Sequence, residues 1–413
     1  MSEQPDPKLQ RPALSEVEGN KAVAVALPRN LPEIAAWIGA LIDSWRYPPA
    51  EKRDLRLDLL RGFAVLVMVV DHFGGASWLY LITGNNSFFT SGAEAFVLIS
   101  GMVVGIVYGG IARRDGLRTA VVRALQRAWI LYRLTIVMTL TLAYLSDFFQ
   151  LPWAKGVDLR DPVAFTLNVI FFRQTYYLAD IPLLYTLLMA FAPLGLWLLR
   201  QNHTRLLLIG SFASWVFFQY VNTAQIEIAP IVGNTTFHPA AWQLIFFWAM
   251  AFGYHRNTIY ARVSAVPRWP YFIFSAMLFI WLVHLYSTEV KVLVRVYPGI
   301  DMAAIVQELF NKSTVAPGRI LATIIVFQFA YLLCTLFWKP IWAIVGWFFL
   351  PLGQNSLYSY TMHVVIIGLF YVALPYLPGI QEMGTLNTGL QLGVLFLLWW
   401  LIRRQFAFDI VPR

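Results

Sequence analysis

Long apolar runs recur along nearly the whole chain, and short polar or charged segments separate them. A helix that crosses a bilayer needs about 20 predominantly apolar residues. The runs that approach or reach this length lie near 57–82, 88–110, 128–148, 181–199, 205–221, 240–255, 270–287, 319–338, 355–376 and 386–402. Two further runs are shorter, and we expect 163–174 to dip into the outer face and 341–351 to be re-entrant. The pattern predicts an all-α fold, a polytopic transmembrane helical bundle of about ten spans.

The segments outside these runs suggest how the rest of the chain is organised. Residues 1–30 are polar with scattered charges, which indicates a disordered cytoplasmic tail and no cleavable signal peptide. Residues 31–53 place apolar side chains at i, i+3 and i+4, which predicts an amphipathic interfacial helix and a linker. This helix lies either on the cytoplasmic membrane surface or against the underside of the domain itself. The transmembrane domain then covers 54–405, and 406–413 form a second cytoplasmic tail.

Composition and charge agree with a membrane protein and set its orientation. The chain is 59% hydrophobic and only 13% charged, which excludes a soluble protein of 413 residues. The net charge of +9 indicates orientation in the membrane rather than nucleic-acid binding. With the N-terminus inside, the only Lys and Arg residues left outside are Lys155, Arg160, Arg173, Lys291, Arg295, Lys312 and Arg319. Both termini are therefore predicted to be cytoplasmic. The single cysteine, Cys334, cannot form an intramolecular disulfide.

The first span, LRLDLLRGFAVLVMVVDHFGG, carries charges that a lipid-facing helix would not tolerate. Asp58 and Arg61 are three residues apart and can pair on one helix face. Arg61 and His72 are eleven residues apart, so they share a face and are separated by roughly 16 Å along the axis. Ionisable side chains at membrane depth are costly, which makes them functional candidates by default. The alternative is a structural Asp–Arg pair together with a histidine hydrogen-bonded between helices.

The second span adds a carboxylate near its outer end. Glu94 lies on the same face as Gly101, Gly105 and Gly109, a stripe of small residues that permits close helix packing. We expect this face to meet the first span, which would bring Glu94 close to Asp71 and His72. A histidine flanked by carboxylates is a common general-base arrangement. A metal site is the alternative, but no further histidine is placed convincingly nearby, so no metal is expected.

These residues resemble a known family. LRLDLLRGFAVLVMVVDHFGG and the glutamate of GAEAFVLISGMVVG resemble the start of the OpgC family, membrane succinyltransferases of osmoregulated periplasmic glucans. That family is similar to acyltransferase family 3, whose first span carries an Arg-x10-His pattern after a Leu-Asp-x-x-Arg-Gly start. Asp58, Arg61 and His72 match this pattern. YYLADIPLLYTLLM, FHPAAWQLIFFWAMAFG and LGQNSLYSYTMH resemble later family segments, in family order. His238 departs from the family, which often has asparagine there.

The resemblance covers most of the chain from residue 53 to the last span, and it implies a reaction. An acyl group, succinyl in the OpgC family, would pass from cytosolic acyl-CoA to a hydroxyl of an extracytoplasmic glycan or glycolipid. The enzyme would act in the bacterial cytoplasmic (inner) membrane. Acyl-CoA would be a donor substrate rather than a permanently bound cofactor, and the remaining partner would be the lipid bilayer.

The resemblance and the residue types together suggest roles for individual side chains. His72 is the expected general base, oriented by Asp71 or Glu94. The residues expected on the donor side are Arg61, Asp58, Arg56 and His363. The residues expected on the acceptor side are Asp180, Trp242, Gln243 and His238. For Trp242 the alternative is a residue of the interfacial aromatic belt, and for His238 it is a plain loop residue.

Two other functions remain open at the level of sequence. A proton-coupled transporter or flippase of an envelope glycan or lipid could use Asp71, His72 and Glu94 as a proton relay. A structural assembly factor of an envelope complex is disfavoured by the buried charges. The Arg-x10-His spacing favours the enzyme, which must release CoA. Whether transfer is direct or passes through an acyl-histidine is not decided by the sequence.

Overall fold

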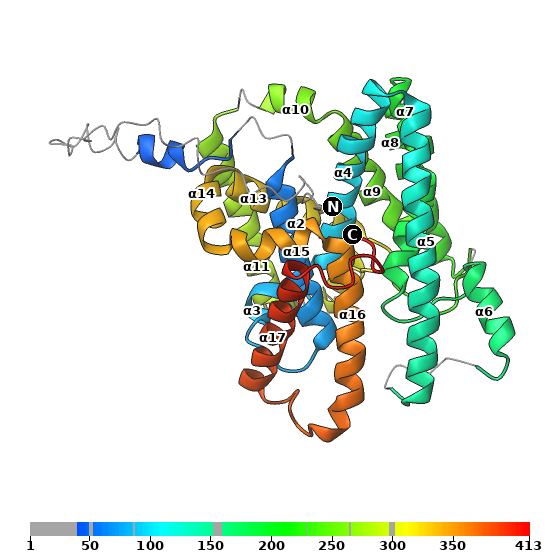
Figure 1. Ribbon diagram of the computed structural model, residues 1–413. Helices are drawn as coiled ribbons and strands as arrows, with labels where there is room; N and C mark the ends of the chain where they lie inside the picture. The colour runs from blue at the N-terminus through cyan, green and yellow to red at the C-terminus, as the bar shows by residue number, and fades with distance from the viewer. Residues whose placement is uncertain are drawn as a thin grey trace, which may run out of the picture.

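The computed structural model describes residues 39–48, 53–85, 87–151, 159–228, 230–263, 266–296 and 302–413. Within these residues the protein is all-helical and has no strand, apart from one isolated bridge between Gln174 and Val232. The helices are α2 (Leu55–Phe73), α3 (Tyr80–Thr83), α4 (Gly92–Arg114), α5 (Leu117–Phe148), α6 (Pro162–Ile170), α7 (Asp180–Arg200), α8 (Thr204–Thr223), α9 (Pro239–Tyr254), α10 (Arg256–Val263), α11 (Arg268–Val296), α12 (Met302–Leu309), α13 (Pro317–Leu336), α14 (Trp338–Ile341), α15 (Trp347–Gln354), α16 (Ser356–Ala373) and α17 (Gly384–Arg403) (Figure 1). The π-helix η3 (Trp342–Gly346) joins α14 to α15, and the 3-10 helix η4 (Leu374–Tyr376) follows α16.

Eight of these helices are long and apolar enough to cross a membrane, so the chain is a multi-pass membrane protein. They are α4, α5, α7, α8, the Arg268–Ser287 part of α11, α13, α16 with its extension to Tyr376, and α17. The two other expected spans correspond to α2 and α9. The 19 residues of α2 include several charges, and α9 has only 16 residues. Ten spans with both termini inside stay a prediction.

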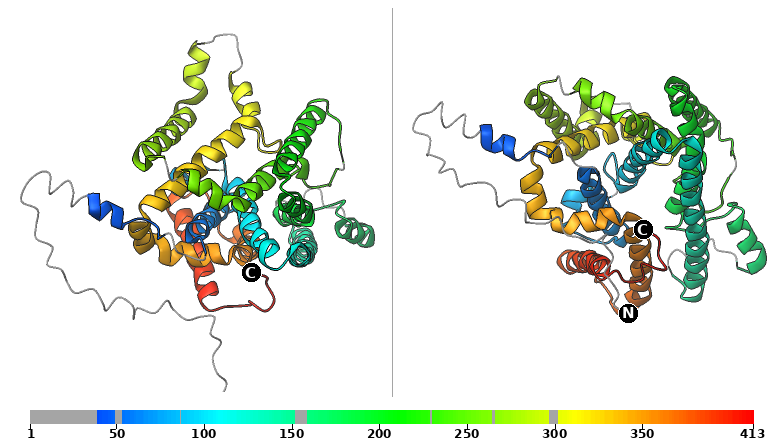
Figure 2. Two further views of the ribbon diagram at one scale, coloured as in Figure 1. Left: turned by 90° about the horizontal axis from the view of Figure 1, so that it is seen from above. Right: turned by 45° about the horizontal axis from the view of Figure 1, so that its top comes forward.

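Helix α2 lies in the middle of the bundle. It contacts α4, α13, α15, α16 and α17, which surround it in the view from above (Figure 2). Asp54 begins α2 because its side chain accepts a hydrogen bond from the backbone N–H of Arg56, the usual role of an N-cap. Gly74 ends it with a φ of 69°, which favours glycine. The expected first span is therefore a shorter, central helix whose charged residues face other helices.

Two close helix contacts depend on glycine. Gly101 and Gly105 of α4 lie against the backbone of α9, and Gly253 of α9 lies against the backbone of α4. The small-residue stripe thus faces α9 and not α2, which corrects our expectation. Gly62 of α2 and Gly353 of α15 make a similar backbone contact. A Cβ atom at any of these positions would collide with a main-chain atom of the opposite helix.

The two short apolar runs form short helices. Residues 163–174 contain α6, which packs against α5, and residues 341–351 contain η3 and most of α15, which packs along α2. The expected interfacial helix lies mostly outside the described residues, but residues 39–44 are helical. Just after them, the backbone N–H of Tyr47 donates to Thr335 and the Tyr47 ring packs edge-on against Trp338. These contacts hold residues 45–47 against the ends of α13 and α14.

Candidate functional site

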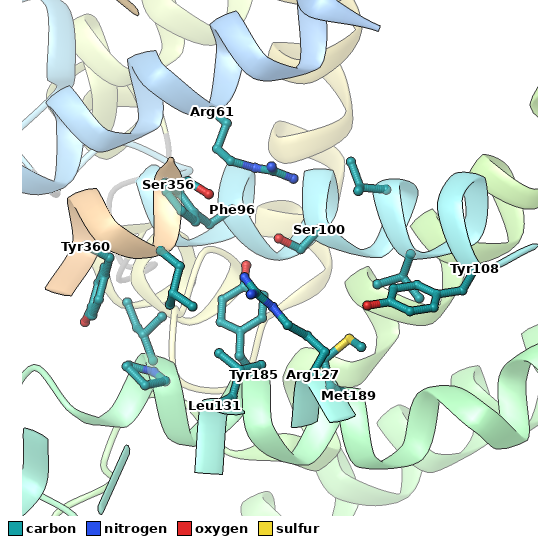
Figure 3. Close-up of a pocket in the computed structure, with 15 residues that line it drawn as sticks. Arg61, Phe96, Ser100, Tyr108, Arg127, Leu131, Tyr185, Met189, Ser356 and Tyr360 are labelled. Atoms are coloured by element: carbon teal, nitrogen blue, oxygen red, sulfur yellow. The ribbon is translucent and has the colours of Figure 1, made fainter. Parts of the chain in front are cut away.

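A pocket of about 180 Å³ opens between five helices of the bundle. Its walls come from α2, α4, α5, α7 and α16, segments that are far apart in the sequence (Figure 3). Most lining residues are apolar, and the polar ones are Arg61, Ser100, Tyr108, Arg127, Tyr185, Ser356 and Tyr360. A mostly apolar pocket with a few convergent polar groups is typical of a small-molecule site.

Two arginines give the pocket a positive charge. Arg61 comes from α2 and Arg127 from α5, and both side chains line the pocket (Figure 3). Within the described part of the chain, neither guanidinium pairs with the side chain of an Asp or Glu residue, and the buried Nε of Arg61 has no hydrogen-bond partner. Arg127 donates from Nη1 to the backbone oxygen of Arg413 at 2.6 Å. The pocket is therefore suited to an anionic ligand.

The expected pair between Asp58 and Arg61 is wrong. Arg53, just before α2, donates from Nε and Nη2 to the two carboxylate oxygens of Asp58 at 2.5 and 2.9 Å. Helical spacing permits an Asp58–Arg61 pair, but the bidentate contact with Arg53 occupies the carboxylate. This arrangement leaves Arg61 available to the pocket.

Arg56 is also placed differently from our expectation of a donor-side residue. Its guanidinium lies between the rings of Tyr47 and Tyr331, at 4.2 and 4.3 Å from their centroids. It also forms a salt bridge with Asp54 and donates to Thr335 at 2.8 Å. These contacts already provide the Arg56 guanidinium with partners, and Arg56 does not line the pocket. Arg56 is therefore a structural residue at the start of α2.

Two histidines meet on the far side of the pocket wall. Nδ1 of His72 lies 3.0 Å from Nε2 of His363, and the two rings are nearly parallel, with an interplanar angle of 17°. The ring of Tyr360, which lines the pocket, packs edge-on against His363 with centroids 4.9 Å apart. His363 is fully buried. Tyr360 thus contacts both the pocket and the histidine pair.

Glu94 does not join this cluster, and our expectation that it orients His72 is wrong. It forms a buried salt bridge with Arg319 of α13. Its other oxygen accepts hydrogen bonds from the backbone N–H and the hydroxyl of Ser91, at 2.8 and 2.6 Å. Ser91 and Glu94 form the capping box that begins α4. The Ser-x-x-Glu spacing in the sequence indicates this capping role. The salt bridge with Arg319 could not be predicted, because Arg319 is distant in the sequence.

The residues expected on the acceptor side are mostly structural. Trp242 is fully buried, and its indole N–H donates to the backbone oxygen of Thr236 at 2.9 Å. Gln243 bonds to the side chain and backbone of Ser211, which ties α9 to α8. His238 caps α9 and stacks on Phe218. These three residues hold α8, α9 and the preceding loop together, and Trp242 is fully buried.

Asp180 and Asp71 remain candidates on the outer side. Asp180 begins α7 and is half-buried, and its carboxylate accepts a hydrogen bond from the N–H of Ile181 at 2.9 Å. Lys312, in the loop before α13, interacts electrostatically most with Glu94, and also with Asp71, Asp180 and His72. Lys312 therefore lies within electrostatic reach of both carboxylates and of His72.

A family model described as OpgC protein matches residues 53–405, which is most of the chain. The chain belongs to the OpgC family. Membership of the OpgC family indicates a glucan-modifying membrane enzyme with a transferase role. No curated protein and no solved structure matches the chain.

Within this OpgC-family chain, several residues of the site were not found by sequence reasoning. Arg127 and Tyr360 line the pocket, and Lys312 interacts electrostatically with Asp71 and Asp180. From the sequence, Arg127 was expected only to be one of the cytoplasmic charges. It lies directly before the apolar run 128–148, at the end of an expected span. Tyr360 lies one helical turn before His363, and this spacing was the available signal.

Proposed function

We propose that this OpgC-family chain is an integral membrane O-acyltransferase of the bacterial inner membrane. It would move an acyl group, with succinyl as the family example, from cytosolic acyl-CoA to a hydroxyl of an extracytoplasmic glycan. One observation carries the proposal: α2 presents Arg61 to an arginine-lined pocket and His72 to the buried His363, whose neighbour Tyr360 lines that pocket.

The pocket is suited to the donor. Guanidinium groups bind phosphate through charge-assisted hydrogen bonds, and Arg61 and Arg127 provide two of them. The apolar walls suit a pantetheine arm and an acyl chain. The pocket is smaller than the roughly 300–1,000 Å³ of a site for a whole drug-sized ligand. It would therefore hold only the diphosphate and the adjoining part of the pantetheine arm, the adenosine would lie beyond it, and the arm would carry the thioester toward His72.

The acceptor would enter from the opposite side. Under the predicted orientation, the loop that carries Lys312 and the start of α7 that carries Asp180 face outward. Carboxylates accept hydrogen bonds from sugar hydroxyls, so Asp71 and Asp180 are the groups that we expect to hold the glycan. Lys312 would balance their charge. This assignment replaces Trp242, Gln243 and His238.

The chemistry requires one base and no redox step. His72 takes the proton from the acceptor hydroxyl, and the oxygen attacks the thioester carbonyl carbon. The tetrahedral intermediate collapses, the C–S bond breaks, and the leaving thiolate takes the proton back from the His72 imidazolium. The products are the glycan ester and free CoA. Arg61 and His72 are separated by roughly 16 Å along α2, a distance that a pantetheine arm covers.

Mass spectrometry of surface glycans tests the proposal in cells. Cells with the wild-type chain are expected to carry acylated glycans, and cells with His72→Gln or Arg61→Gln are expected to lack them. Arg123→Gln is the matched control, because Arg123 is exposed on α5, one turn before Arg127, and does not line the pocket. Unchanged acylation in His72→Gln would contradict the proposal. A transporter would instead change where the glycan is found without adding mass to it.

A further inference from the structure

The hydrogen bonds around the two histidines fix which ring nitrogen carries a proton. We propose that His363 is the positioning residue for His72. Anchored by the backbone oxygen of Ser359, it would hold His72 in the tautomer whose Nε2 lone pair faces the acceptor. This inference rests on the proposed acyl transfer, and it assigns to His363 the orienting role that we had expected of Asp71 or Glu94.

The chain of bonds starts at the backbone of α16. Nδ1 of His363 lies 3.3 Å from the carbonyl oxygen of Ser359, one turn earlier in the same helix. A carbonyl oxygen can only accept, so Nδ1 of His363 carries the proton. In a neutral imidazole the other nitrogen is then an acceptor. His363 is fully buried, and none of its described contacts is with a carboxylate, so the neutral form is favoured.

The next bond sets His72. Nδ1 of His72 lies 3.0 Å from Nε2 of His363. Since Nε2 of His363 accepts, Nδ1 of His72 must donate. The ring planes are 17° apart and the centroids 5.2 Å apart, so the rings meet edge to edge and the N–H of one can point at the in-plane lone pair of the other. The remaining nitrogen of His72, Nε2, therefore has its lone pair free to accept the proton of a hydroxyl.

This arrangement suits a base that must gain and return one proton. When Nε2 of His72 takes the hydroxyl proton, Nδ1–H continues to donate to His363, which stabilises the imidazolium. His363 neither gains nor loses a proton during the cycle. His363 therefore affects the rate only through His72, so a substitution at His363 should have no effect on the rate once His72 is removed.

Substitutions at His363 test this role in purified full-length protein. His363→Leu removes the acceptor and is expected to lower kcat by about 10²-fold or more, with the KM for acyl-CoA unchanged. His363→Gln keeps an acceptor oxygen and is expected to retain more of the rate. His284→Gln is the control, because His284 is exposed on α11. A normal kcat in His363→Leu would overturn the inference.

A double-mutant cycle separates positioning from packing. In the His72→Ala background, His363→Leu is expected to cause no further loss of rate, because the residue acts only through His72. An equal loss in both backgrounds would mean a packing role and would overturn the inference. A fully active His72→Ala protein would instead contradict the proposed function itself, so the two failures are distinguishable.

Nitrogen-15 NMR of histidine-labelled wild-type protein reads the tautomer directly, without any measurement of rate. Signals of His72 can be assigned by their absence in His72→Asn. The inference expects a protonated Nδ1 and an unprotonated Nε2 on His72. The opposite tautomer would overturn it.

Discussion

Arg61 and Glu94 are both charged residues inside the helical bundle, but their surroundings differ. Glu94 has Arg319 and Ser91 as partners, whereas the Nε of Arg61 has none within the described residues. A buried charge that lacks a partner is costly unless a ligand supplies one. At the scale of single residues, this difference separates the pocket arginine from the structural carboxylate.

Removing Arg319 should destabilise the protein more than it affects the chemistry. Arg319→Met leaves Glu94 buried without its counter-charge, which is expected to cost about 3–5 kcal/mol. The double variant Arg319→Met with Glu94→Gln should recover part of that loss, because the amide carries no charge. Thermal unfolding in detergent measures both. A fully stable Arg319→Met protein would show that the salt bridge contributes little.

Trp242→Phe should leave the acceptor KM unchanged. The ring is fully buried and its only described hydrogen bond is to the backbone of Thr236, so the change removes one bond, worth about 1 kcal/mol. Steady-state kinetics with varied glucan checks this. A several-fold rise in acceptor KM, with normal stability, would contradict this and would show that Trp242 belongs to the acceptor site.

The positions of the helices could largely be predicted from the sequence, but which helices contact each other could not. The apolar runs correspond to the observed long helices because bilayer thickness fixes their length. The common face of Arg61 and His72 follows from helical periodicity alone. The stripe of Gly101 and Gly105 predicted a close helix contact, but it did not predict that α9 would be the partner helix. Likewise, nothing near His72 in the sequence points to His363, because the contact joins residues 291 apart.

The contact between α2 and α15 is the element-level feature most sensitive to substitution. Gly62→Ala or Gly353→Ala places a methyl group against the main chain of the opposite helix, so the helices must separate. We expect each to cost about 1–3 kcal/mol and to lower kcat, since α2 carries Arg61 and His72. Gly368→Ala, on α16 with open space around it, is the control. Gly62→Ala with unchanged stability and rate would contradict this account of the packing.

At the scale of the whole molecule, orientation decides which substrate reaches which side. The charge distribution predicts ten spans with both termini inside, and under that orientation we expect the arginine-lined pocket to face the cytoplasm. A reporter fused after residue 413 is expected to read cytoplasmic, and one in the 288–316 segment between the spans of α11 and α13 is expected to read external. An external C-terminus would place the arginine-lined pocket outside, where no acyl-CoA is available.

Release of free CoA by the purified protein tests the central claim most directly. With succinyl-CoA and a glucan acceptor, the wild-type protein should release CoA at a rate that depends on the glucan. His72→Ala should bind succinyl-CoA as tightly as the wild type, measured by calorimetry, and should release CoA about 10²–10⁴-fold more slowly. His284→Ala should match the wild type in both measurements. Turnover of His72→Ala at the wild-type rate would contradict the account, because His72 would then be a packing residue.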